Sequence, residues 1–508
     1  MSTGREDLFR LIQSMSKSEK RYFKMESKKA GDKTSNHIKL FDAINNLEEY
    51  DEGVLKKKLK KEKFIEHLSA EKRYLYQAVL RSIRNFRGDQ SIFAQIKTLV
   101  LDANNLLERG LYIQAEKMLE KAEKLASKID DTVSLLEINL KKQELSRAHK
   151  KNEHQQELEA LMKDKDEIVE LLLTKLKLRD VLNQVAVVYQ AEQDVSHFNK
   201  IKGIIEENVD WIEHTQKIDS FFGIYCNTMI RSFIYNLNGE SEKLFKIRSS
   251  LISLWNQYPE IKEEFYYQFL VDLNSFIGNY IKLNQNEKAF ELLQELENEK
   301  PKSFHAQVYI FKNVAIKKLL YLMNKGAFEE ALLLIPNIEK GIKKYNLNIS
   351  SKLALLLNTA ILYYCIESYK DCIIWVNKII KSYKSNHRLD VQRIARLLEI
   401  VAQIEIENDY ETIDNLFRST QRFFKNTGIK EKNQSEFILL DHLWKYHNSP
   451  KFKQKEVLIN FKASIDKMKN HKTEKSTPGS DELYYWVRSK LEKKPIAQLI
   501  KESYKPGN

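Results

Sequence analysis

The sequence is short of the residues that break helices. It contains 14 glycines and 7 prolines among 508 residues, about 4% of the chain, whereas average usage is roughly 12%. Because short strands need frequent turns, this shortage favours long helices joined by short connections. Lysine, glutamate, leucine and isoleucine are abundant, and all four are compatible with helices. The composition therefore predicts an all-α protein.

Cysteine is also scarce, with only Cys226, Cys365 and Cys372 in the chain. No two of them form a C-x-x-C pair, so neither a zinc ribbon nor a redox motif is present, and three thiols do not make a disulfide framework. We expect these thiols to pack as small apolar side chains in a reducing compartment.

No apolar run is long enough to cross a bilayer. The longest stretch without charge covers residues 353–366, and Asn358 and Thr359 interrupt it, whereas a membrane helix needs about 20 apolar residues. The opening MSTGREDLFR has charges where a signal peptide has its apolar segment. We therefore expect a soluble, cytoplasmic protein that does not bind membranes.

Motifs for catalysis and cofactor binding are missing. The phosphate loops G-x-x-x-x-G-K-[ST] and G-x-G-x-x-G, the zinc motif H-E-x-x-H and the nucleophile motif G-x-S-x-G do not occur. The closest histidine pairs, His149/His154 and His442/His447, are five residues apart, about 140° around a helix. We expect no metal, no cofactor and no enzymatic activity. An enzyme whose site assembles from distant residues remains an alternative.

Positive charge is concentrated at the two ends of the chain. The formal net charge is +13, to which residues 1–90 and residues 451–508 each contribute +7, while the long middle contributes −1. A balanced middle is typical of a scaffold with mixed surface charge.

A short sequence motif recurs along this middle part. The segments KGAFEEALLL, ESYKDCIIWV and ENDYETIDNLF each have an aromatic residue, two polar residues and then a small or aliphatic residue. We call the first of these four positions, which is aromatic in the best copies, the anchor. Anchors recur every 41–46 residues, at Tyr112, His154, Val195, Ser241, Asn286, Phe328, Tyr369, Tyr410 and Phe452. In the best copies the third residue after the anchor is small, as at Ala115, Ala289, Ala331 and Cys372.

We interpret each copy as a pair of helices. A break such as RGLY or NKGAF ends one helix, the aromatic anchor packs in the turn, and the small residue lets the second helix cross the first closely. Residues 328–342 have apolar positions three and four apart, the pattern of one half-buried helix. Because one pair cannot bury its apolar face, we expect about nine pairs to stack into a solenoid.

The turn motif G-x-[YF]-x-x-A resembles the inter-helix turn of tetratricopeptide repeats (TPR). It occurs at residues 110–115 and 326–331, and the resemblance covers roughly residues 90–470. The period exceeds the usual 34 residues, and the Trp/Leu/Gly signature of the first helix is absent, so HEAT-type arrays are also compatible. The resemblance implies a right-handed superhelical solenoid that binds a protein or peptide and rarely catalyses a reaction.

The sequence predicts three parts: a basic N-terminal helical domain at residues 1–90, a TPR-like solenoid at residues 91–475 and capping helices at residues 476–508. In the first part, Ser16 and Glu19 have the spacing of a helix capping box.

The last helix of the N-terminal domain, over residues 69–86, has two different faces. Its apolar face carries Leu75, Tyr76, Val79, Leu80, Ile83 and Phe86. Its opposite face carries Arg73, Gln77, Arg81 and Arg84. Beside the run LKKKLKKEKF these arginines could hold nucleic-acid phosphates, although a basic face is most often simply solvated.

In TPR-like arrays the first helix of each pair lines a concave groove. By that analogy the candidate partner-binding residues are Asn183, Asn274, Lys282, Asn313 and Tyr364. Asparagine can hold a peptide backbone through a paired donor and acceptor, although each position could equally be solvated. We expect a non-enzymatic scaffold or adaptor that binds a protein or peptide. The alternative is a regulator whose N-terminal domain contacts nucleic acid while the array senses a partner.

Overall fold

The computed structural model describes most of the chain. The described residues are 6–29, 36–47, 49–88, 91–149, 154–190, 195–214, 220–301, 303–345, 347–381, 388–407, 409–427, 435–470 and 479–504. Every regular element among them is a helix, as the composition predicts. The chain forms two compact units, residues 1–279 with 301–306 and residues 280–300 with 307–508. The predicted three-part division is not tested by these units and stays a prediction.

The N-terminal helices have an apolar core of their own, in which Leu40, Phe41 and Ile44 are fully buried. The elements are α1 (Asp7–Ser14), α2 (Lys17–Lys29), α3 (Asn36–Asn45), α4 (Glu52–Lys58), the 3-10 helix η1 (Lys63–His67) and α5 (Leu68–Gly88). At the start of α2 the Ser16 N–H donates to Glu19 Oε2 at 2.7 Å, and the Glu19 N–H donates to Ser16 Oγ at 3.2 Å. These two bonds confirm the predicted capping box.

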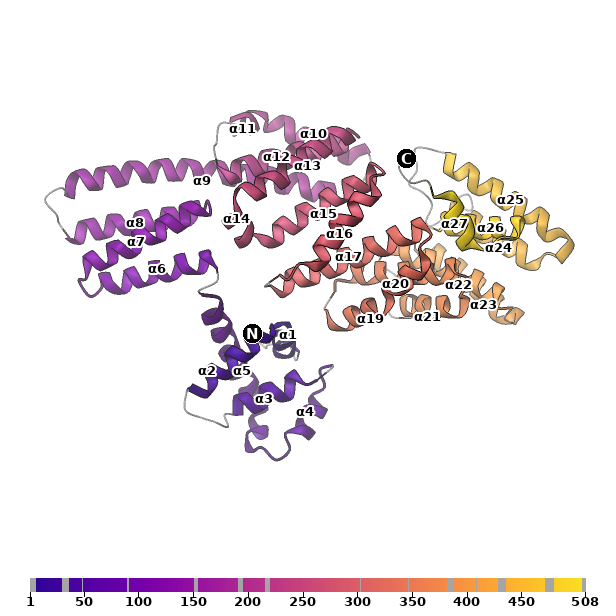
Figure 1. Cartoon of the computed structure of the whole chain (residues 1–508), viewed down its shortest axis with the longest axis horizontal. Helices are drawn as coiled ribbons and strands as arrows, with labels where there is room; N and C mark the ends of the chain where they lie inside the picture. Colours follow the sequence, from indigo (N-terminus) through magenta and orange to yellow (C-terminus); the bar gives the residue numbers. More distant parts are fainter. Residues whose placement is uncertain are drawn as a thin grey trace. The chain divides into compact units, whose positions relative to one another are not determined.

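The helices from α6 to α15 follow one another closely along the chain. They are α6 (Ile92–Leu107), α7 (Tyr112–Lys128), α8 (Thr132–His149), α9 (His154–Gln190), α10 (Val195–Glu207), α11 (Val209–His214), α12 (Phe221–Leu237), α13 (Ser241–Gln257), α14 (Pro259–Glu264) and α15 (Tyr266–Lys282). Figure 1 shows α6 to α9 side by side, and α6 packs on both α7 and α8. Helix α9 packs in turn on α8, α10, α11 and α12.

The second unit continues the same pattern. Its helices are α16 (Asn286–Asn298), α17 (Phe304–Lys325), α18 (Phe328–Leu332), α19 (Ile335–Lys344), α20 (Ile349–Cys365), α21 (Tyr369–Ile380), α22 (Leu389–Glu405), α23 (Tyr410–Asn426), α24 (Ser435–Asn448), α25 (Lys451–Asn470), α26 (Ser480–Glu492) and α27 (Ile496–Ser503). From α20 onward each helix packs on the next, and α22 packs on both α20 and α24. One apolar core joins them, and it includes Trp486 and Ile496 of the last two helices.

One backbone conformation recurs in the turns between consecutive helices. A residue with φ between 56° and 76° lies two positions before the next helix at Gly110, Asp130, Gly239, Asn284, Gly326 and Glu367. Before α7, the Gly110 N–H donates to Leu107 O and the Leu111 N–H donates to Leu106 O, both at 3.0 Å. Equivalent bonds occur in the other five turns. This is the Schellman motif, which satisfies the final carbonyls of a helix and favours glycine at the left-handed residue.

The predicted anchors coincide with the starts of helices. Eight anchors are the first residue of a helix, and Phe452 is the second residue of α25. The small third residues of the best copies are buried, namely Ala115, Ala289, Ala331 and Cys372. The later copies differ, because Lys455 is exposed and the side chains of Tyr410 and Phe452 are 58% and 80% exposed. The side chains of His154 and Val195 lie outside the described part of the chain.

Two segments depart from the predicted helix pairs. Between the anchors His154 and Val195 the chain forms one helix of 37 residues, because no glycine or proline interrupts it. The single helix expected over residues 328–342 is instead two helices, α18 and α19. Pro336 in the first turn of α19 has no N–H for the preceding turn, so the helix breaks there.

Candidate functional site

The predicted partner-binding residues are divided between the two units. Asn183 is exposed on α9, and Asn274 is half-buried on α15, both in the first unit. Lys282 is exposed at the end of α15 and belongs to the second unit. Asn183 and Lys282 are therefore accessible, whereas the Asn274 Oδ1 atom is buried, and the partner-binding role of all three stays a prediction.

The other two candidates are in less accessible positions in the second unit. Asn313 on α17 is half-buried, and its side-chain amide donates to Tyr309 O at 2.9 Å. Tyr364 is fully buried, and its hydroxyl donates to Glu482 O of α26 at 3.4 Å. Tyr364 therefore belongs to the core and not to a groove surface, because a helix more than a hundred residues away in sequence covers it.

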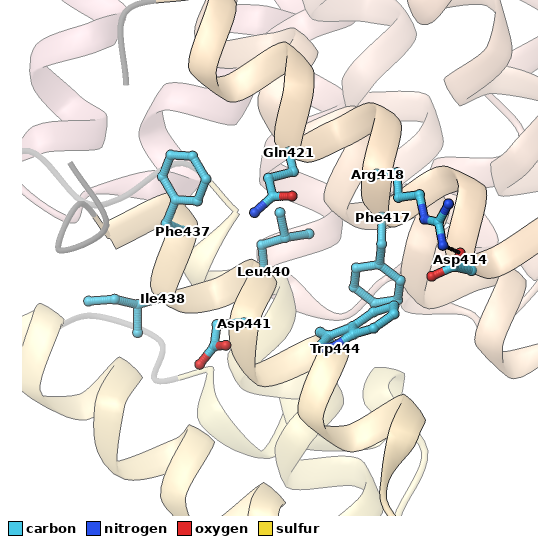
Figure 2. A pocket seen from close by; sticks show the side chains of 9 residues that line it. All are labelled: Asp414, Phe417, Arg418, Gln421, Phe437, Ile438, Leu440, Asp441 and Trp444. Carbon is cyan, nitrogen blue, oxygen red and sulfur yellow. Dashed lines mark ion pairs between the residues drawn. The ribbon is translucent and has the colours of Figure 1, made fainter. Parts of the chain in front are cut away.

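The structure instead contains a hollow between α23 and α24 that the sequence analysis did not identify. Its volume is about 630 Å³, within the range usual for ligand sites. The described residues that line it are Asp414, Phe417, Arg418, Gln421, Phe437, Ile438, Leu440, Asp441 and Trp444. Figure 2 shows these side chains, with Phe417 and Trp444 close together beside the Asp414–Arg418 ion pair, Gln421 and Leu440 near the middle, and Phe437 and Ile438 on the opposite side.

The spacing of residues along each helix places these side chains on one surface. On α23 the lining positions are 414, 417, 418 and 421, and on α24 they include 437, 440, 441 and 444. Both sets follow i, i+3, i+4, i+7, the spacing of one helix face. Asp409 is the N-cap of α23, and its side chain accepts the Thr412 N–H at 2.8 Å, which fixes where this helix begins.

Aromatic side chains form the floor of the hollow. The rings of Phe417 and Trp444 meet edge to face with centroids 5.0 Å apart, and Phe437 meets Phe424 in the same way at 5.7 Å. Phe417 is buried, whereas Trp444 and Phe437 remain half-exposed. Such rings offer a large apolar surface at little cost in side-chain entropy.

Charged groups lie at the edge of the hollow in opposed pairs. Arg418 Nη2 lies 2.8 Å from Asp414 Oδ2, and Lys445 Nζ lies 2.6 Å from Asp441 Oδ2. Arg418 and Asp441 are exposed, so each of these ion pairs is screened by water. The hollow therefore has an apolar floor with both signs of charge at its edge, an arrangement that suits an amphipathic peptide.

Two histidines of α24 pack against aromatic rings outside the lining of the hollow. The His447 ring stacks on Tyr410 with centroids 5.2 Å apart, and the His442 ring stacks on Phe461 at 4.8 Å. Burial lowers the pKa of both imidazoles, so they are neutral at physiological pH. Within the described residues, no three His, Cys, Asp or Glu side chains come together as a metal site requires.

The cysteines are buried, as the sequence predicts. Burial raises the pKa of the Cys226 and Cys372 thiols to about 12 and that of Cys365 further. Thiols that stay protonated at neutral pH are poor nucleophiles. These side chains therefore contribute packing and not reactivity.

A buried carboxylate in the first unit has a structural environment. Asp272 on α15 accepts hydrogen bonds from Trp255 Nε1 at 2.9 Å and from Gln268 Nε2 at 3.3 Å, and the Tyr225 hydroxyl lies 3.5 Å away. Burial raises the pKa of Asp272 to about 6. This network ties α12, α13 and α15 together.

The predicted arginines of the N-terminal helix lie on its surface. Arg73, Arg81 and Arg84 on α5 are all exposed, while Leu75 and Val79 on the opposite side are buried. The two faces predicted for this helix are therefore present, except that Leu80 of the predicted apolar face is 38% exposed.

One feature of the sequence, the width of the apolar arc of α24, indicates the hollow. On a helical wheel α24 carries Phe437, Ile438, Leu440 and Trp444 over a wider arc than one buried stripe needs. An apolar arc of that width indicates a second contact surface.

Comparisons with known proteins gave no further guide. No protein-family model matches the chain, and neither a curated protein nor a solved structure matches it. Among the described helices, none combines the length and the apolar character needed to cross a bilayer.

Proposed function

We propose that this protein is a non-enzymatic cytoplasmic adaptor whose helix pairs form a TPR-like, right-handed solenoid and hold a polypeptide partner. Support for the repeat comes from the recurring turn conformation and from the packing of neighbouring helices within each unit. The observation that carries the binding role is the hollow between α23 and α24.

The shape of the hollow favours a short amphipathic helix as its occupant. Its lining positions extend over eight residues on each wall, about 10 Å of helix. Two bulky apolar side chains one turn apart on a partner helix would fill that length and contact Phe417 and Trp444. Partner side chains of either charge would then meet Arg418 or Asp441 at the edge and set the orientation.

The test is peptide selection against the full chain from a displayed library of random peptides. Ile438 is half-exposed and lines the hollow, so Ile438→Trp should fill the space without opening the core. Selected peptides should share paired apolar residues at i and i+3 or i+4. Their affinity should fall at least about ten-fold on Ile438→Trp, roughly 1.4 kcal/mol.

The matched control removes an aromatic ring elsewhere in the same unit. Phe452 is 80% exposed on α25 and does not line the hollow, so Phe452→Ala should leave peptide binding unchanged. Peptides that bind Ile438→Trp as tightly as the unaltered chain would refute the hollow as the binding site.

A further inference from the structure

Helix α5 presents a surface that the adaptor role does not use. At 100° per residue, six exposed side chains fall within an arc of about 100°: Ala70, Arg73, Tyr74, Gln77, Arg81 and Arg84. This set contains no carboxylate and extends over about four turns of the helix. We call it the α5 basic face.

The three arginines of this face are not engaged within the protein. Neither hydrogen bonds nor ion pairs join Arg73, Arg81 or Arg84 to other side chains of the described residues. In contrast, Arg87 of the same helix lies 3.2 Å from Glu19. The carboxylate of Glu71 lies outside the arc, 3.7 Å from His37. Within α5, Arg87 is therefore paired with a carboxylate of the protein, whereas the other three arginines are solvent-exposed cations.

The segment before α5 adds net positive charge. Lys60, Lys61 and Lys63 precede α5 by five to eight residues, are exposed, and have no ion-pair partner among the described residues. Of the two carboxylates beside them, Glu62 is paired with Lys39 and Glu66 is exposed. Residues 1–90 carry a net charge of +7. A field of one sign attracts a polyanion and accelerates its association.

We propose that the α5 basic face binds the major groove of duplex DNA. The helix is about 10–12 Å in diameter, and the major groove is about 12 Å wide. Arg73 and Arg84 are separated by about 16 Å of helix, so the face can reach phosphates on both sides of the groove. Gln77 lies in the middle of the arc and faces the base edges, where glutamine pairs with adenine.

Other polyanions fit this surface less well. A bilayer would need a broad apolar face, yet Leu80, at 38% exposure, and Ala70 are the apolar residues near the arc. Single strands need a groove with several stacking rings, and Tyr74 is the one aromatic side chain on the face. The major groove of an RNA duplex is too deep and narrow for a helix to enter.

The test measures binding of the full chain to a fluorescent DNA duplex of about 20 base pairs, over about 50 to 200 mM salt. Arg73→Gln, Arg81→Gln and Arg84→Gln are combined in one variant. Three lost phosphate contacts should reduce the slope of log affinity against log salt by about 3 and weaken binding by roughly a hundred-fold or more near 100 mM salt. Because all three side chains are exposed, the thermal melt should not change.

The control variant removes the same charge from another exposed helix of the first unit. Lys117, Lys121 and Lys124 lie on α7, are exposed and have no ion pair within the described part. Changing all three to glutamine should alter DNA affinity little. An equal loss in both triple variants would overturn the proposal, since net charge alone would then explain binding.

Three further results would also overturn it. One is no DNA binding by the unaltered chain at the lowest salt. Another is equal affinity for an RNA duplex of the same sequence. The third is tighter binding to phosphatidylserine vesicles or to polyglutamate than to DNA. None of these results would affect the peptide-binding test of the α23–α24 hollow, which lies in the other unit.

Discussion

A buried ion pair in the first unit makes a quantitative prediction about how its helices are held together. Lys175 on α9 is 6% exposed, and its Nζ lies 2.5 Å from Asp130 Oδ1 and 2.6 Å from Thr132 Oγ1. Asp130 is the left-handed residue of the turn between α7 and α8, and its Oδ2 accepts the Phe222 N–H at 3.0 Å. One carboxylate thus joins this turn to α9 and to the first turn of α12.

The substitution Asp130→Asn tests this link without changing the backbone. Asparagine tolerates positive φ and is close to aspartate in shape, so the main change is the loss of the negative charge. Lys175 would then be a buried cation without a counter-charge. Removing one partner of a buried pair destabilises a protein by about 3–5 kcal/mol, and we expect about 3 kcal/mol here because Asp130 itself is 19% exposed.

The double variant separates the charge effect from packing. Lys175→Met removes the cation at similar volume, so Asp130→Asn combined with Lys175→Met leaves no buried charge. The double variant should be more stable than the sum of the two single effects by about 2 kcal/mol. Because the two units need not unfold together, hydrogen exchange of peptides from α8, α9 and α12 is the appropriate readout. A cost below about 1 kcal/mol for Asp130→Asn, or additive single effects, would refute the reasoning.

Three smaller predictions concern the turns, the buried carboxylate and the capping box. Gly110→Ala should cost about 1 kcal/mol for its positive φ, and Gly326→Ala should cost more, because its new Cβ would lie 2.9 Å from Lys501 Cβ; hydrogen exchange in the helices on either side of each turn measures the two costs separately, because the two glycines lie in different units. The folded pKa of Asp272, about 6, lies above its ordinary 3.8, so its stabilisation is present below pH 4 and is lost as pH rises through 6. Asp272→Asn should therefore gain stability relative to the unaltered chain, by up to about 3 kcal/mol, between pH 4 and pH 7 in melts at several pH values. Ser16→Ala should destabilise the N-terminal helices by about 1 kcal/mol, measured by hydrogen exchange in α2.

Local features of the fold could be read from the sequence because they depend on neighbouring residues. The shortage of glycine and proline predicted helices, and Gly110 and Gly326 marked turns in which their backbone has positive φ. The anchors predicted helix starts because the turn and the first helical residues lie within a few positions of one another. Two local expectations were wrong. Pro336 breaks the continuous helix expected over residues 328–342, and residues 154–190 form one long helix in place of a helix pair because no glycine or proline interrupts them.

The candidate site was predicted much less well, because burial depends on residues far apart in the chain. Tyr364 looked like a surface residue by analogy, yet α26 covers it. The hollow needs two helix faces to meet at a particular separation, and Phe417 and Trp444 reveal nothing of that separation in the sequence. The sequence predicted correctly that the exposed face of α5 carries Arg73, Arg81 and Arg84, because the periodicity of a single helix determines which side chains share a face.

The sequence by itself thus determined where helices begin and end and which face of each is apolar, since backbone hydrogen bonds and side-chain periodicity act over a few residues. Only the tertiary structure decided which polar groups pair in the core, as Lys175 does with a turn 45 residues away. It also decided which apolar faces remain uncovered, because those outcomes follow from how neighbouring helices pack and not from any single segment.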